Sequence, residues 1–208
     1  MTINGFDELN TPKIEVEEPE EYFAKMDISE DQKEERVEAS KELRDVLLFF
    51  FALLAIQLES GGDLEWVYTE FTVRYGNVVR KYARLDEYIE TYIREKTSDI
   101  ELKTLSGIES EWYTSADRAL LIGENEANSI LNYEDYQKAV EAGYRFKEWR
   151  GVMDAKERKS HVRMEGKKIP IDDYFIFDDC YMFAPHDEVN GTPEQTANCR
   201  CSVKYTKD

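Results

Sequence analysis

The chain has 208 residues, of which 41% are hydrophobic, and its 27 Lys and Arg against 45 Asp and Glu give a formal net charge of -18. This length suits one medium domain or two small ones, and the hydrophobic content excludes a disordered acidic tail. The charge argues against a protein that binds nucleic-acid backbones over its whole surface, because such binding depends on cationic side chains replacing phosphate counterions.

The number of cysteines and the pattern of hydropathy indicate the cellular compartment of the protein. Three cysteines cannot build the disulfide framework of a small secreted protein, so we expect a reducing compartment. Residues 1–10 contain no basic segment followed by an apolar run, and we expect no signal peptide. The longest apolar run, Val46 to Ile56, is about half of the roughly 20 residues that span a bilayer. It predicts a buried helix and no membrane partner.

The first 28 residues predict an acidic flexible arm. They contain Pro12, Pro19 and a cluster of acidic residues between Glu15 and Glu21, with little periodic hydrophobicity. Such a segment orders against a partner or stays flexible.

Residues 29–115 predict a helical region. Ser29 is a good N-cap, and a helix is expected from there through the apolar run to Glu59, before Gly61 and Gly62. Because the second half of this helix is apolar on every side, it is buried in a helical bundle or against another chain, and we favour the bundle.

Further helices are expected along the chain. One begins after Asp63 with a possible interruption at Gly76, and apolar residues then recur at helical spacing up to about Lys96. Ser115 begins another helix, and Asn132 is expected to cap a short one.

After Gly143 the pattern changes to that of a small mixed module. The charge changes there as well: residues 1–45 hold 15 acidic and 6 basic side chains, residues 46–144 hold 18 and 9, and residues 145–208 hold 12 of each. The fold class predicted is α+β, with an N-terminal helical region followed by a mixed α/β module at 116–208. The elements expected in the module are strands at 144–153, 167–171, 174–177 and 199–205 and helical turns at 155–164.

Three groups of residues stand out as candidate sites. Arg118 and Glu126 lie eight residues apart on one helix face around Ile122, which predicts an exposed charge pair beside a core contact.

The second group is Trp149, Asp154, Arg158, His161 and Gly166. Its Asp, Arg and His can orient a proton-transfer histidine or bind a phosphate, and the alternative is a helix cap, an ion pair and a structural histidine. We favour the structural interpretation because no nucleophile accompanies the histidine.

The third group is Cys199, Arg200 and Cys201. On a strand the two thiols point the same way, and His161 would make a third zinc ligand, with Cys180 or His186 as a fourth. Two buried thiols without metal are the alternative, and the spacing favours that alternative.

Basic residues gather in the second half, where they form a possible nucleic-acid contact or a solvated face. No phosphate loop, dinucleotide fingerprint or two-histidine protease helix is present, so we expect no enzyme. The candidate nucleic-acid contacts are Arg150, Lys156, Lys159, Arg163, Lys167 and Lys168.

Taken in order, these groups resemble the phage head morphogenesis family, the Mu protein F-like minor head proteins. The resemblance covers about residues 116–203 and ends on the Asn198 to Cys201 motif. Many members have cysteines at the positions of Arg158 and His161 and a histidine at that of Thr196. These departures remove much of a four-ligand zinc site from this chain. The resemblance therefore implies a structural knot at the C-terminal motif, with a zinc site as the alternative.

The resemblance also implies a function. It predicts a minor virion component inside the capsid near the portal, present in the host cytoplasm during assembly and acting in head morphogenesis and DNA packaging or ejection. Its implied partners are the portal protein, contacted by residues 29–115, and capsid or scaffold protein, with packaged DNA touching the C-terminal module. The alternatives are a nuclease or transferase-type toxin module and a zinc-stabilised nucleic-acid-binding module.

Overall fold

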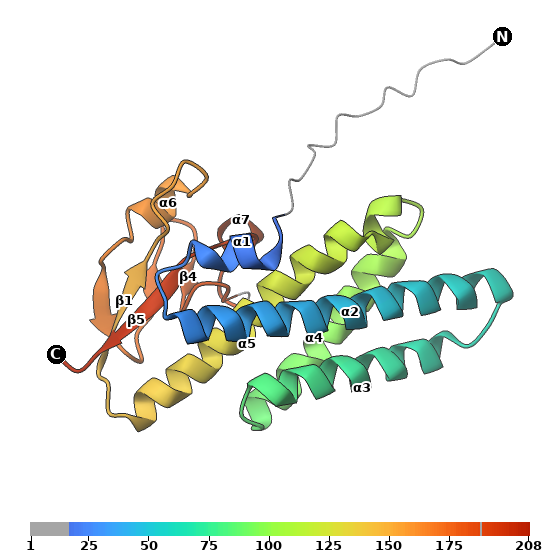
Figure 1. Cartoon of the computed structure of the whole chain (residues 1–208), viewed down its shortest axis with the longest axis horizontal. Coiled ribbons are helices and arrows are strands. Elements are labelled where there is room, and N and C mark those ends of the chain that lie inside the picture. The colour runs from blue at the N-terminus through green and yellow to red at the C-terminus, as the bar shows by residue number, and fades with distance from the viewer. Residues whose placement is uncertain (1–16, 188) are drawn as a thin grey trace, which may run out of the picture.

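The computed structural model describes residues 17–187 and 189–208, so most of the predicted acidic arm lies outside the described residues. A bundle of long helices is followed by a small strand-containing module, which confirms the predicted α+β class (Figure 1). The helices are α1 (Pro19–Ala24), α2 (Glu30–Ser60), α3 (Leu64–Tyr82), α4 (Glu87–Ser106), η1 (Glu111–Thr114), α5 (Ala116–Glu141), α6 (Lys159–Val162) and α7 (Pro193–Thr196). The strands are β1 (Phe146–Arg150), β2 (Lys168–Pro170), β3 (Phe175–Ile176), β4 (Tyr181–Met182) and β5 (Ser202–Thr206).

Helix α2 follows its sequence signals closely. Ser29 and Gln32 form a capping box, in which the serine side chain accepts from the Gln32 amide and the glutamine side chain accepts from the Ser29 amide. Gly61 ends the helix with a left-handed φ of 66°, a conformation that costs glycine little. No helix among the described residues is both long and apolar enough to cross a membrane.

The other long helices differ from the expected pattern at three points. Gly76 does not interrupt α3. It lies where α3 comes close to α4, and an added Cβ there would lie 3.3 Å from Ile93. Asp86 caps a separate helix α4, which continues to Ser106 instead of stopping near Lys96. Asn132 does not begin a short helix, since it is buried inside the continuous α5.

The bundle is held by an aromatic core and by a close crossing of α2 and α5. The rings of Phe50 and Phe71 stack with centroids 4.2 Å apart, joining α2 to α3. At the crossing, Gly123 of α5 has no side chain, and a Cβ there would lie 2.6 Å from the Ser40 carbonyl oxygen. A side chain at position 123 would therefore force the two helices apart.

The C-terminal module has two small antiparallel sheets. The first has strand order β2-β1-β5, with Trp149 of β1 opposite Val203 of β5, and the second pairs β3 with β4. Strand β4 and helix α7 were not predicted, because two and four residues are too few for a periodic pattern. The core of this module consists of Trp149, Met164, Phe175, Phe177, Met182, Cys199 and Cys201.

Helix α1 corrects part of the predicted flexible arm. Pro19 begins the helix, and Tyr22, Phe23 and Met26 are buried. The Tyr22 hydroxyl donates to the Cys199 carbonyl at 2.7 Å, so the helix docks on the C-terminal module. Burial of two aromatic rings outweighs the acidic composition that suggested flexibility.

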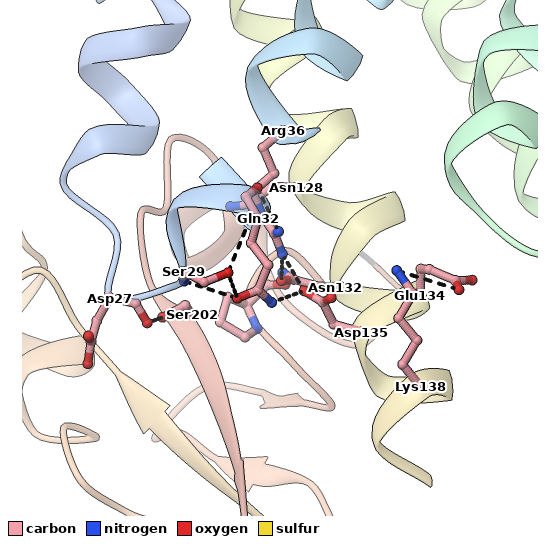
Figure 2. A network of polar contacts seen from close by, with 11 residues as sticks. Asp27, Ser29, Gln32, Arg36, Asn128, Asn132, Glu134, Asp135, Lys138 and Ser202 are labelled. Atoms are coloured by element: carbon pink, nitrogen blue, oxygen red, sulfur yellow. Dashed lines mark hydrogen bonds and ion pairs between the residues drawn. The ribbon is translucent and has the colours of Figure 1, made fainter. Parts of the chain in front are cut away.

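A polar network around the buried Arg36 links α2 to α5 and, through Asn132, reaches the C-terminal module (Figure 2). Arg36 of α2, 1% exposed, donates to Asn128 and Asn132 at 3.1 Å each and forms an ion pair with Asp135 at 2.8 Å. The Asn132 side chain in turn donates to the Pro185 carbonyl of the module at 2.9 Å. The charge of the guanidinium is thus compensated on several sides, as a buried charge requires.

Candidate functional site

Three predicted ligand side chains come together in a thiol–imidazole cluster formed by His161, Cys199 and Cys201. The Nδ1 atom of His161 lies 3.4 Å from Sγ of Cys199 and 3.3 Å from Sγ of Cys201. All three side chains are buried, and their donor atoms lie within 4.8 Å of one another. Two thiols and an imidazole are ligands that suit zinc.

The backbone around the cluster explains why these side chains converge. Cys199 and Cys201 stand just before β5 and both turn toward His161, as alternation in an extended segment predicts. His161 lies in the one-turn helix α6, and its ring meets that of Trp149 edge to face at 5.3 Å. Gly166, with φ of 71°, turns the chain back so that its amide donates to the Trp149 carbonyl.

Gln195 sets the tautomer of the histidine. Its amide nitrogen donates to both carboxylate oxygens of Asp179 at 3.1 Å, so its Oε1 faces the other way as an acceptor. That oxygen lies 3.1 Å from Nε2 of His161, which must therefore carry the proton. The lone pair of Nδ1 consequently faces the two thiols, in the form that a metal ligand requires.

The two thiols have opposed acidities. A hydrogen bond with Cys199, together with burial, raises the pKa of the Cys201 thiol. Although burial alone would raise the pKa of Cys199, the hydrogen bond with Cys201 lowers it. One shared proton between two close thiols accounts for both shifts.

Neither predicted fourth ligand belongs to the cluster. Cys180 is half-buried and packs against the module core, and His186 has its Nε2 against the Cys199 carbonyl oxygen. The carboxylate of Glu157 instead lies 3.5 Å from Sγ of Cys201. A small cavity of about 20 Å³ beside the cluster is lined in part by Glu157 and has the size that one water molecule needs.

The Asp154, Arg158 and His161 group does not act as one unit. Asp154 forms a two-pronged ion pair with Arg200 at 2.7 and 2.9 Å, and this arginine lowers the pKa of its carboxyl group. Arg158 stands at the N-cap position of α6 and donates to the Ala197 carbonyl. The pairing with Arg200 removes Asp154 as an orienting group for His161, so the structural interpretation of this group fits better than a proton-transfer site.

The predicted exposed pair of Arg118 and Glu126 is wrong, because both side chains are buried and have separate partners. Arg118 donates to Thr104 at 2.9 Å and lies over the Phe51 ring. Glu126 accepts hydrogen bonds from the hydroxyl groups of Tyr75 and Tyr92 and lies 3.4 Å from the ammonium group of Lys96. Both residues thus join helices of the bundle.

Several of the predicted nucleic-acid contacts already have acidic partners. Arg150 pairs with Asp27 at 2.8 Å, Lys156 with Glu17 at 2.9 Å, and Arg163 with Asp178 at 2.6 Å. The other three are exposed: Lys159, Lys167 and Lys168. The positive potential of this surface is therefore lower than the sequence count suggested.

Sequence reasoning missed two residues that shape the module. Gln195 has no local pattern, since its role depends on partners 16 and 34 residues away. Lys147 is fully buried, donates to the Phe183 carbonyl at 2.7 Å, and lies 3.2 Å from the centroid of that ring. Burial lowers the pKa of Lys147 to about 7. The sequence of β1, Phe-Lys-Glu-Trp-Arg, does not alternate polar and apolar residues, so its pattern does not mark Lys147 as buried.

Comparison with known proteins gives two matches. The family model described as phage Mu protein F like protein matches residues 81–204, which begins 35 residues before the resemblance expected at Ala116. The NAD(+)--arginine ADP-ribosyltransferase EFV of Enterococcus faecalis is 28% identical over 100 residues. That match covers 46% of this chain, whereas the chain spans about a fifth (20%) of the length of the transferase. No solved structure matches significantly.

Proposed function

Because the chain belongs to the phage Mu protein F-like family of head morphogenesis proteins, we propose that it is a minor structural protein of a tailed-phage head, bound at the portal vertex inside the capsid. The observation that carries the proposal is the family match over residues 81–204, which runs from the end of α3 to β5 and includes the thiol–imidazole cluster. In this role the protein acts in head assembly and in DNA packaging or ejection.

The distribution of charge supports a division of labour between the two parts. The acidic helical half would be repelled by DNA and would face protein, with the portal protein as first partner and capsid or scaffold protein as others. The C-terminal module has equal numbers of acidic and basic residues and can approach packaged DNA through its exposed lysines.

The proposal is tested on assembled heads. We expect mass spectrometry of purified heads to detect this polypeptide in few copies and the portal protein to co-purify with it from infected cells. Heads that lack the polypeptide, together with no portal co-purification, would refute the proposal. As a control, the tail fraction of the same lysate is expected to be enriched neither in this polypeptide nor in the portal protein.

For the cluster, we propose that His161, Cys199 and Cys201 hold a structural zinc ion. Zn–S bonds of about 2.3 Å and Zn–N bonds of about 2.0–2.1 Å at tetrahedral angles separate S from N by roughly 3.5 Å. The S–N distances of 3.3 and 3.4 Å are close to that value. Glu157 or a water molecule in the adjoining cavity is the fourth ligand. The ion would hold α6 against the start of β5.

Metal analysis of the reduced protein tests this assignment. We expect close to one equivalent of zinc in the wild type and a large loss in Cys199→Ser and Cys201→Ser. Cys180→Ser is the matched control and is expected to keep its zinc. Less than about a tenth of an equivalent in the wild type would exclude a structural zinc site.

The transferase match supports a second candidate function, that of a toxin-type enzyme module. The activity in the name of that relative belongs to a protein of which this chain spans about a fifth (20%), so we favour the structural role. Release of nicotinamide from NAD⁺ by the purified chain, lost in His161→Ala, would favour the enzyme. No turnover at high protein concentration would count against it.

A further inference from the structure

A large cleft lies between the helical bundle and the C-terminal module. It has a volume of about 860 Å³ and is lined by residues of α4 and α5, by Tyr174, and by residues of the segments 183–187 and 189–197. Its lining residues run from Tyr88 to Ala197, so the cleft lies wholly within the family-matched part of the chain. This volume is in the upper part of the range of roughly 300–1,000 Å³ that is typical of ligand sites. We call it the tyrosine cleft, after Tyr88, Tyr92, Tyr133, Tyr136 and Tyr174 in its lining.

Two tyrosines of the cleft expose ring surface from fixed positions. Tyr88 of α4 is 48% exposed and stacks on Tyr133 of α5, with ring centroids 4.3 Å apart. The Tyr133 hydroxyl donates to the carboxylate of Asp86, and this hydrogen bond fixes the Tyr133 ring on which Tyr88 stacks. Tyr174 comes from the C-terminal module, is 41% exposed, and meets Phe183 edge to face at 5.5 Å. Rigid, partly exposed rings of this kind bind partner side chains at a low entropic cost.

The charges in the lining disfavour a phosphate-bearing ligand. Both lysines are ion-paired, Lys96 with Glu126 at 3.4 Å and Lys103 with Asp99 at 2.7 Å. The lining also contains the carboxylates of Glu95 and Asp187. Negative charge therefore exceeds positive charge in the cleft, which would repel nucleic acid and attract a cationic group.

We propose that the tyrosine cleft binds a short basic peptide segment of a partner protein. One apolar side chain or proline of the segment packs against Tyr88 and Tyr174, and a neighbouring Lys or Arg lies beside Glu95 and Asp187. This proposal rests on the proposed function only for the identity of the partner, which would be the portal protein.

A random decapeptide library displayed on yeast is the first probe, and the full-length chain is the bait. We expect the selected peptides to be enriched in Lys or Arg next to Pro, aromatic or large aliphatic residues. Their binding, measured by fluorescence polarisation, should weaken at least about tenfold in Tyr88→Ala and Tyr174→Ala, because tyrosines in interface pockets are common hot spots. Glu95→Lys should weaken it further at low salt.

Matched control variants distinguish peptide binding in the cleft from non-specific binding elsewhere on the surface. Trp66→Ala removes a ring of similar exposure (46%) on α3, and Glu38→Lys reverses an exposed charge on α2. Both are expected to leave binding unchanged. Selection of acidic peptides, selection of none, or equal binding by wild type and cleft variants would overturn the proposal. Binding of a labelled oligothymidine that is lost in Tyr88→Ala would also overturn it, in favour of nucleic acid.

A portal pull-down distinguishes failure of the cleft from failure of the proposed function. Portal protein captured by the wild type and lost in Tyr88→Ala supports both. Equal capture by wild type and Tyr88→Ala leaves the function standing and removes the cleft as its portal contact. If the wild type captures no portal protein while basic peptides still bind the cleft, the peptide site stands and the portal function fails.

Discussion

At the residue scale, Glu124 of α5 is a buried acid without compensation. It is 2% exposed, and its Oε1 atom has no hydrogen-bond partner among the described residues. Burial, with Glu17 and Glu18 nearby, raises the pKa of Glu124 to about 8. The group therefore stabilises the fold only while it is protonated.

Because the pKa of Glu124 is raised in the folded state, the free energy of unfolding falls as pH rises. Protonated Glu124 contributes fully below the unfolded pKa of about 4.5, and that contribution is lost as pH rises through about 8. We predict that Glu124→Gln removes this loss and raises the free energy of unfolding at pH 8.5 by on the order of 2 kcal/mol. Urea denaturation at pH 5.5 and 8.5 measures it. A gain that is equal at both pH values would contradict the raised pKa.

Gln195 offers a second test at this scale, one that depends on the tautomer of His161. If Oε1 of Gln195 holds the proton on Nε2 of the histidine, Gln195→Ala should weaken zinc binding by roughly 10–100-fold. Competition with a coloured zinc chelator measures the affinity. Gln137→Ala, on α5, is the control. Unchanged affinity in Gln195→Ala would show that the glutamine does not orient the ligand.

The sequence predicted which side chains form the cluster better than it predicted their surroundings. His161, Cys199 and Cys201 could be grouped because few residue types bind zinc and only two histidines exist. The exposed pairing of Arg118 with Glu126 failed because spacing shows which residues share a helix face but not what covers that face. The contact between Glu157 and Cys201 could not be predicted, since it depends on how two loops meet.

At the scale of elements, Gly123 controls the distance between α2 and α5. An alanine would gain helix propensity of up to about 1 kcal/mol, but its Cβ would lie 2.6 Å from the Ser40 carbonyl oxygen and 3.2 Å from the Arg44 amide nitrogen. We predict a net loss of about 1–3 kcal/mol in the free energy of unfolding for Gly123→Ala, because neither backbone atom can move alone. Urea denaturation measures it.

The control for Gly123→Ala is Ser98→Ala at an exposed position of α4. It adds helix propensity without approaching another backbone and should be neutral or slightly stabilising. If Gly123→Ala instead raised the free energy of unfolding, α2 and α5 would be able to move apart without a loss of stability.

Helix boundaries were predictable where a cap residue precedes a strong apolar pattern. Ser29, Asp63 and Ser115 were identified correctly as N-caps, and each accepts a backbone amide. Asp86 was missed because the tyrosines around it keep a helical spacing across the break. Helix α1 was missed because six residues in an acidic segment give no period, and its stability comes from distant partners.

At the scale of the whole molecule, the net charge of -18 hides a neutral module. We predict weak DNA binding by the full chain, with a log–log salt slope no steeper than about -4, because the module has no net charge and two of its exposed cations, Lys156 and Arg163, already pair with acidic residues. Each phosphate contact contributes about -0.9 to the slope. The double variant Lys159→Glu with Lys167→Glu should make the slope shallower by about 2. Fluorescence anisotropy between 20 and 200 mM salt measures it.

A control for the DNA measurement reverses two cations of the helical half, Lys41→Glu with Arg94→Glu. This variant is expected to bind as the wild type does. Binding that does not change with salt would contradict a phosphate contact altogether.

The docking of α1 has a consequence for synthesis on the ribosome. Tyr22 and its acceptor at Cys199 are separated by 177 residues, and Asp27 accepts from Ser202 across 175. At roughly 5–20 residues per second, translation leaves α1 without these partners for on the order of ten to thirty-five seconds. A nascent chain that stalls before β5 leaves Tyr22 without its acceptor and accessible to chaperones and proteases, so a docked α1 marks a polypeptide translated through β5.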